Sequence, residues 1–234
     1  MALPKLNDAP QYEMVIPSSK TKVMYRPYLV KEEKIMLMAA ESQDPKAAMM
    51  AMVDTIVACV SEDIQPTDLT SFDVEYMFTQ IRSKSVGETA EIILPCSECE
   101  TKNDAFVSLI SAQVTEAPES NIIELSPRIS LEMKYPSFND YADVYKDDIP
   151  EAELAFSMIE KCISAVLTED ERYDIAESNP KELKDFIESM TNAQFEKVGS
   201  YFQQMPKLVS KCEFTCTNCG HENSIDLEGL QSFF

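Results

Sequence analysis

An α+β fold is predicted, because the spacing of apolar residues changes along the chain. Short runs with a period of two, typical of strands, occur near both ends and in the middle of the chain, and stretches with a period near 3.6, typical of helices, lie between them. Two Cys-x-x-Cys pairs, each directly after a strand-like run, lie far apart in the sequence. These features predict helical regions around a small β module.

Residues 1–88 are predicted to form an N-terminal hairpin with helices. Two β-rich runs at 12–17 and 22–26 flank a short polar turn. Asp44 is a good N-cap residue and Pro45 suits the first position of a helix. The helices expected in this part cover residues 29–42, 45–60 and 71–83.

Strands are predicted to follow Gly87, and helices are predicted after them. Residues 128–135 alternate, with Ile129, Leu131 and Met133 on one face. The expected strands cover residues 89–95, 105–110, 121–125, 128–135 and 207–214. The expected helices cover 151–167, a segment opening at Asn179-Pro180, and 191–205. The predicted domains are 1–88, a β module of 89–136 with 206–234, and a helical insertion of 137–205.

Composition excludes several classes of function. The chain has 20 basic and 41 acidic residues and a formal net charge of −21, which disfavours nucleic-acid binding and anionic membranes. Its 4 glycines form no phosphate-binding loop, and His221 is its single histidine, so little acid–base or triad chemistry can be built. No basic segment followed by an apolar one opens the sequence, and no secretory signal is expected. An enzyme is therefore disfavoured.

The cysteine pairs are the one motif with clear chemistry. Cys96 and Cys99 form one Cys-x-x-Cys, and Cys216 and Cys219 form the other, each followed by polar, turn-forming residues. Two such pairs supply the four thiolates of a tetrahedral zinc site, and Gly220 suits the positive φ that the turn requires. Because a reducing compartment is expected, metal binding is favoured over disulfides. The sequence thus predicts a zinc-ribbon-like module with one structural zinc ion.

Other interpretations of the cysteines stay open at this point. Either pair could be a redox dithiol, or the thiols could simply pack in the interior. Cys212 or His221 could replace one ligand, since both lie close to the second pair. Cys59 and Cys162 lie on apolar helical faces and are expected in the core.

Two longer stretches of the N-terminal part are distinctive. The first is Tyr25-Arg-Pro-Tyr-Leu-Val-Lys-Glu-Glu-Lys-Ile-Met-Leu-Met-Ala-Ala-Glu-Ser42. The second is Phe72-Asp-Val-Glu-Tyr-Met-Phe followed by Arg82-Ser-Lys-Ser-Val-Gly-Glu88. Together with the Cys-x-x-Cys after them and the closing Leu-x-Gly-Leu-x-x-Phe-Phe, they resemble signatures of the baseplate hub protein family of T-even-like contractile-tailed phages. That family includes a hub subunit and a hub-assembly factor.

The resemblance implies a non-enzymatic tail protein that contacts other hub and tail proteins, in the host cytoplasm during assembly and in the virion baseplate afterwards. It implies no small-molecule substrate, no nucleic acid and no membrane. It makes Arg26, Lys31, Arg82 and Lys84 candidate partner contacts. The alternative function is a zinc-ribbon nucleic-acid or transcription-associated factor, against which the acidic charge counts.

The C-terminal segment is strongly apolar. Burial of its large apolar side chains is favourable, and a chain end is ordered when such contacts tie it down. These side chains are Leu227, Leu230, Phe233 and Phe234. The segment is expected either to fold back over the zinc module, which we favour, or to insert into a neighbouring hub protein.

Overall fold

The computed structural model describes residues 9–42, 44–140 and 150–233. It confirms an α+β architecture of helices and small antiparallel sheets. Two compact units are present: unit 1 contains Met1–Thr115 and Lys207–Phe234, and unit 2 contains Glu116–Pro206. Within unit 1 the backbone N–H of Thr115 donates to the carbonyl oxygen of Lys207 at 2.9 Å, so the chain leaves and re-enters this unit at adjacent points. Among the described residues, no helix is long and apolar enough to cross a membrane.

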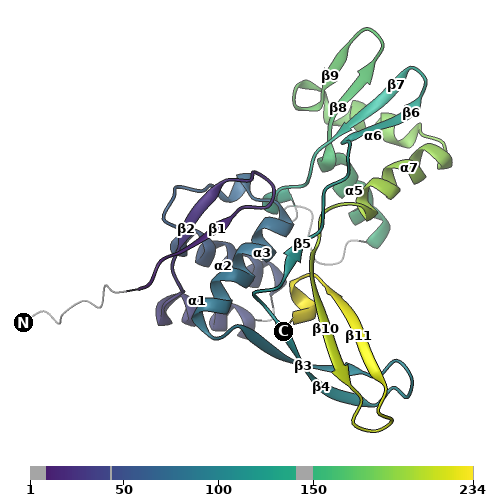
Figure 1. Ribbon diagram of the computed structural model, residues 1–234. Helices are drawn as coiled ribbons and strands as arrows, with labels where there is room; N and C mark the ends of the chain where they lie inside the picture. The colour runs from purple at the N-terminus through teal and green to yellow at the C-terminus, as the bar shows by residue number, and fades with distance from the viewer. Residues whose placement is uncertain (1–8, 43, 141–149, 234) are drawn as a thin grey trace, which may run out of the picture. The chain divides into compact units, whose positions relative to one another are not determined.

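Unit 1 begins with a hairpin that packs beside three helices. Strands β1 (Tyr12–Val15) and β2 (Lys22–Tyr25) pair antiparallel, as predicted. The helices are α1 (Val30–Glu41), α2 (Pro45–Cys59) and α3 (Ser71–Ser85). Helix α2 packs against both other helices (Figure 1). Its start is as expected, because the Asp44 carboxylate accepts from the Lys46 N–H at 2.9 Å.

Asp73 joins the hairpin to α3. Its side chain accepts from the backbone N–H groups of Thr70 and of Ser18, each at 2.9 Å, and is 0% exposed. The first bond caps the start of α3, and the second holds the turn between β1 and β2 against this end of the helix. A short local motif thus positions a segment that is distant in sequence.

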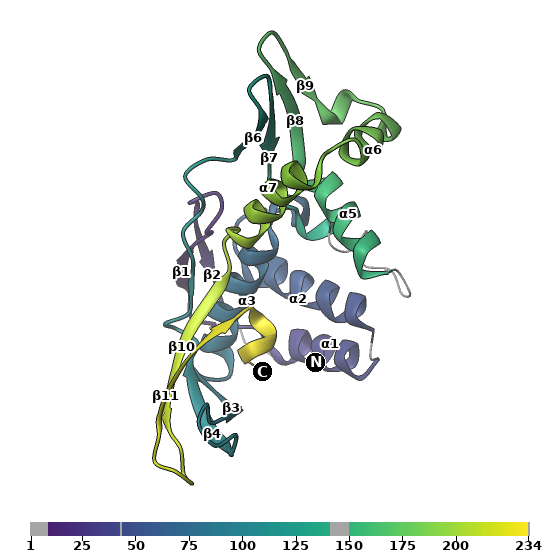
Figure 2. The same cartoon turned by 90° about the vertical axis from the view of Figure 1, so that its right-hand side faces the viewer.

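The β module of unit 1 consists of two hairpins that lie side by side (Figures 1 and 2). The first pairs β3 (Thr89–Pro95) with β4 (Lys102–Ser108), and the second pairs β10 (Leu208–Thr215) with β11 (Glu222–Glu228). A short strand, β5 (Gln113–Val114), pairs with β10 and was not predicted. Buried residues at one end of the hairpins form a core, and the turns at the other end carry the cysteine pairs.

The C-terminal segment folds back onto this module, as favoured. The 3₁₀ turn Leu230–Phe233 packs against α3 and β3, and Phe233 is 0% exposed within the core of the β module. Leu227 and Leu230 are also buried. Phe234 lies outside the described residues.

Unit 2 is a four-stranded antiparallel sheet with helices. The strands, in the spatial order β6-β7-β8-β9, are β6 (Ile122–Ser126), β7 (Ile129–Met133), β8 (Ile163–Thr168) and β9 (Arg172–Asp174). The helices are α5 (Glu151–Cys162), α6 (Pro180–Glu188) and α7 (Asn192–Gln203). Leu131 and Met133 face the core, and Ile129 packs against it, which confirms the predicted face of β7.

Two predictions about this region are wrong. The helix expected to run to residue 167 ends at Cys162, and β8 follows at once. The strands expected near 121–135 pair with each other and with β8, and not with the strands that carry the cysteines. The reason is that Ile163, Ala165 and their neighbours satisfy a helical and an alternating pattern equally well. Part of the expected helical insertion, residues 141–149, lies outside the described residues, and the three-domain division remains a proposal.

Candidate metal centre

The cysteine pairs lie at the turns of the two hairpins of the β module. Cys96 and Cys99 lie between β3 and β4, and Cys216 and Cys219 lie between β10 and β11. In the first turn the Cys96 N–H donates to the carbonyl of Thr101 at 2.9 Å, and in the second the Cys216 N–H donates to the carbonyl of His221 at 2.8 Å. The two turns therefore have the same backbone hydrogen bonds, although their sequences differ.

Both turns need a left-handed residue directly after the second cysteine. Gly220 has φ 73°, as expected from the sequence. The equivalent position in the first turn is Glu100, with φ 58°. A side chain is disfavoured in this conformation, so the first turn is strained where the second is not.

The four predicted ligands converge on one point. Their Sγ atoms all lie within 4.8 Å of one another. Between the turns, the Cys96 and Cys219 sulfurs are 3.7 Å apart, and those of Cys99 and Cys216 are 3.6 Å apart. A tetrahedral zinc site with Zn–S bonds of 2.3 Å has S···S edges of about 3.8 Å, whereas a disulfide bond is about 2.05 Å long. The four cysteine sulfurs and their spacing fit the binding of one metal ion by all four, and they do not fit a disulfide bond.

The thiols differ in acidity. Hydrogen bonds with the side chain and then the backbone of Thr101 lower the pKa of Cys99 to about 6. A backbone hydrogen bond at His221 lowers the pKa of Cys219, but the hydrogen bond with Cys99, burial and the other two cysteines raise it to about 12. Four thiolates this close repel one another, so a bound cation is what lets all four lose their protons together.

The other cysteines have structural surroundings. Cys59 is 2% exposed and Cys162 is 0% exposed, as expected for core residues, and burial raises their pKa values to about 11 and about 12. Cys212 is buried in the core of the β module. Within the described residues, the group that could hold a metal ion contains neither Cys212 nor His221.

Sequence reasoning missed two asparagines beside the sulfurs. Asn103 and Asn223 are 3% and 4% exposed, and each amide nitrogen lies near a cysteine sulfur. The signal was present in the sequence. Each pair reads Cys, hydroxyl residue, any residue, Cys, three residues, Asn.

The basic residues near α1 are less available than expected. Arg26 is an internal residue: its guanidinium donates to Glu32 at 2.9 Å and to the carbonyl of Ala58 at 2.8 Å. Burial lowers the pKa of Arg82, and Lys84 pairs with Glu88. Lys31, with a side chain 70% exposed, is open to a partner even though it reaches Glu32. Arg26 therefore has a structural role beside the buried Glu32 carboxylate, and its contact with a partner stays a prediction.

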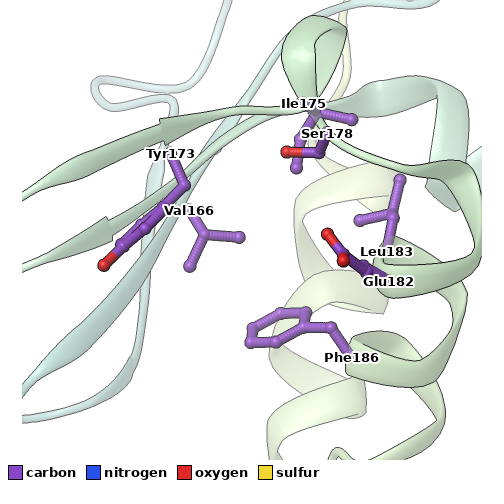
Figure 3. Close-up of a pocket in the computed structure, with 7 residues that line it drawn as sticks. All are labelled: Val166, Tyr173, Ile175, Ser178, Glu182, Leu183 and Phe186. Carbon is purple, nitrogen blue, oxygen red and sulfur yellow. The ribbon is translucent and has the colours of Figure 1, made fainter.

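Unit 2 contains a hollow lined by described residues. It has a volume of 240 Å³ and lies between β8–β9 and α6, lined mostly by apolar groups such as Val166 and Phe186 (Figure 3). Among the described residues that line it, Glu182 carries a carboxylate, and Ser178 and Tyr173 carry hydroxyl groups. The Ser178 hydroxyl donates to the carbonyl of Asp174 at 2.9 Å.

Comparison with known proteins identifies the family. The model of the family described as T4 bacteriophage base plate protein matches residues 9–234. No curated protein and no solved structure matches the chain. Members of a baseplate family are structural parts of the phage tail and contact other tail proteins. Because the match includes both signature stretches and both cysteine pairs, the chain belongs to the T4 bacteriophage base plate protein family.

Proposed function

We propose that this protein is a non-enzymatic baseplate hub subunit or hub-assembly factor that acts through contacts with other tail proteins. The family match over residues 9–234 is the observation that carries the proposal. The protein would act in the host cytoplasm during assembly and then in the virion baseplate. The net charge of −21 supports a role without nucleic acid. Retention on DNA or heparin columns at moderate salt would contradict that part.

The outward side of α1 supports contacts with protein partners. Val30 is 79% exposed, and Leu37 and Met38 are each 60% exposed, whereas Glu32 on the opposite side is buried. On a helix, residues 30, 37 and 38 share one face. Clustered exposed apolar side chains mark sites of interaction. Lys31, at the edge of this face, would favour an acidic partner surface.

The hub role can be tested by genetic complementation. A phage lacking this gene should fail to build complete baseplates, and the wild-type gene should restore them. Leu37→Glu should leave the fold intact but fail to restore assembly, because it places a charge on the exposed apolar face. Ile122→Glu in unit 2, where Ile122 is 50% exposed, is the matched control and should restore assembly. Infectious tails without the gene would overturn the proposal.

We further propose that Cys96, Cys99, Cys216 and Cys219 hold one structural zinc ion per chain. All four ligands come from the protein, which leaves no open position for a substrate. Elemental analysis of protein prepared without added metal should find close to one equivalent of zinc. Cys99→Ser should lower the zinc content and the melting temperature, and Cys59→Ser, at a core thiol, should leave the zinc content unchanged. Wild-type protein without zinc would contradict the proposal.

A further inference from the structure

We propose that Asn103 and Asn223 are a reciprocal pair of positioning residues for the metal centre, each holding the cysteine turn of the other hairpin. The proposal rests on the zinc site proposed above. It concerns how tightly that site retains its metal.

The two asparagines occupy equivalent positions. Asn103 is the second residue of β4 and is the partner of Leu94 in β3. Asn223 is the second residue of β11 and is the partner of Phe214 in β10. Both follow the first cysteine of their own turn by the same number of residues. The two hairpins therefore present their amides to the site in the same way.

Each amide oxygen binds the opposite turn. Asn103 Oδ1 accepts from the backbone N–H and the hydroxyl of Thr217, at 2.8 and 2.9 Å. Asn223 Oδ1 accepts from the backbone N–H and the hydroxyl of Ser97, at 2.9 and 3.0 Å. Ser97 and Thr217 are the residues directly after the first cysteine of each turn. These bonds fix the backbone that carries the opposite ligand.

Each amide nitrogen is directed at an opposite sulfur. Asn103 Nδ2 lies 3.7 Å from Cys216 Sγ, and Asn223 Nδ2 lies 3.6 Å from Cys96 Sγ. The second N–H of each amide donates within its own turn, to the carbonyl of Thr101 or of His221, at 2.7 and 3.1 Å. Every hydrogen-bonding position of both buried side chains is thus occupied.

This arrangement has a consequence for the ligands. An N–H directed at a thiolate stabilises its negative charge and fixes the direction of the sulfur. Cys96 and Cys216, the first cysteine of each pair, are buried, so little water can take over this role. Both first cysteines then depend on the asparagine of the opposite hairpin. Loss of either amide should weaken metal retention by about 10- to 100-fold, as is typical for groups that orient metal ligands.

Replacement of asparagine by aspartate removes the N–H bond to sulfur together with the N–H bond to the carbonyl of Thr101 or His221, and it adds a carboxylate charge beside the thiolates. Asn103→Asp and Asn223→Asp keep the shape and the accepting oxygen but replace the N–H donor with an oxygen. The experiment measures zinc affinity by competition with a chromophoric chelator on the full-length protein. We expect similar losses from the two variants, because the positions are equivalent. Asn121→Asp is the control, since the Asn121 amide donates to the carbonyl of Met133 in unit 2 and should leave zinc affinity unchanged.

A spectroscopic measurement separates positioning from general destabilisation. In the cobalt-substituted protein, loss of an N–H···S bond should shift the sulfur-to-metal charge-transfer band to lower energy, because the thiolate becomes more electron-rich. If the aspartate variants do not fold, Ser97→Ala and Thr217→Ala test instead whether the asparagine contacts contribute to zinc affinity. These residues are exposed, and each variant removes one hydroxyl donor to an asparagine oxygen. A few-fold loss of zinc affinity is expected from each.

The outcomes distinguish the two proposals. Wild-type protein without metal would overturn both the zinc site and the role of the asparagines. Zinc-loaded wild type with unchanged affinity and spectrum in folded Asn103→Asp and Asn223→Asp would overturn the role of the asparagines alone. If the aspartate variants do not fold, unchanged zinc affinity in both alanine variants would also overturn the role of the asparagines alone.

Discussion

The two units stabilise small antiparallel sheets in different ways. In unit 2, α6 and α7 contribute Leu183 and Val198 to one apolar core with β7 and β8. In unit 1, Ile93 and Phe106 of the first hairpin are each 64% exposed, and the four cysteines lie at the turns of the two hairpins. Two-stranded hairpins are only marginally stable by themselves. The comparison teaches that a cysteine cluster can hold hairpin ends at which the apolar core is only partly buried.

Metal removal should produce the largest difference between the units. The free energy of zinc binding is about 10–16 kcal/mol in zinc fingers and becomes folding free energy when the unfolded chain has no site. A strong chelator should therefore abolish hydrogen-exchange protection at the Cys96 and Cys216 amides, which are bonded within the turns. Amides of β7 and β8 should keep their protection.

A variant without the site provides the control. In Cys96→Ser/Cys219→Ser protein, the chelator should change nothing further. Equal loss of protection in both units on chelation would contradict the comparison, since it would place the metal-dependent stability outside the β module.

Truncation of the cores should give the next largest effects, each in its own unit. Phe233 in unit 1 and Leu131 in unit 2 are both 0% exposed. Phe233→Ala should cost about 3–5 kcal/mol and Leu131→Ala about 2–5 kcal/mol of unfolding free energy. Urea unfolding followed by hydrogen exchange assigns each loss to a unit. A loss under about 1 kcal/mol for Phe233→Ala would show that the C-terminal turn contributes little to the β module.

The sequence predicts the core around Phe233 better than it predicts the sheet of unit 2. Four large apolar side chains close together in sequence predict burial of the C-terminal segment, and the Cys-x-x-Cys spacing predicts a metal site beside it. In contrast, the apolar spacing of Ile163 to Thr168 fits a buried helix as well as a strand, and its strand partners are fixed only by tertiary contacts. Long-range pairing of this kind leaves little local signal.

At the candidate site, too, some features follow from local sequence and others only from tertiary contacts. The four ligands follow from two local motifs. The roles of Asn103 and Asn223 follow from contacts between hairpins that are distant in sequence, so local spacing gives their position but not their partners. Arg26 illustrates the same limit, because its charge is visible in the sequence and its ion pair with the buried Glu32 is not.

Removal of one ion pair from each unit should give a smaller difference in unfolding free energy between the units. Arg26 and Glu32 have side chains 17% and 5% exposed, whereas Arg172 of unit 2 is 44% exposed beside Glu132. Arg26→Ala leaves a buried carboxylate without its main partner and should cost about 3 kcal/mol. Arg172→Ala should cost under about 1 kcal/mol. Urea unfolding at neutral pH measures both.

The pH dependence gives a second measurement of the buried pair. Burial by itself raises the pKa of Glu32, but hydrogen bonds from Arg26, Leu29 and Lys31 hold it below its ordinary value of 4.5. Because the folded-state pKa is the lower one, this stabilisation is present above about pH 4.5 and is lost as the pH falls through the folded-state value. The difference between wild type and Arg26→Ala should therefore shrink in acid. A difference that stays constant down to pH 3 would contradict the role of the Glu32 charge.

The smallest expected effects lie within unit 1, between its two cysteine turns. Glu100 has φ 58° where the second turn has Gly220 at φ 73°. Glu100→Gly should raise the unfolding free energy of the zinc-loaded protein by up to about 1 kcal/mol, because glycine adopts this conformation without strain. Gly220→Ala should lower it by about 1 kcal/mol. A Cβ at residue 220 would meet nothing within 4 Å, so the cost comes from the backbone conformation alone.

Lys20→Gly tests whether the gain in unfolding free energy expected for Glu100→Gly comes from relief of backbone strain or from tighter metal binding. Lys20 has φ 57° in the turn between β1 and β2, which carries no cysteine. If relief of backbone strain is the cause, Lys20→Gly and Glu100→Gly should give similar gains, and the gain at Glu100 should persist after the zinc is exchanged for cobalt. A gain at Glu100 alone, accompanied by tighter zinc binding, would instead mean that the first turn is strained against its metal geometry. The two cysteine turns would then differ in how they hold the ion and not merely in how they fold.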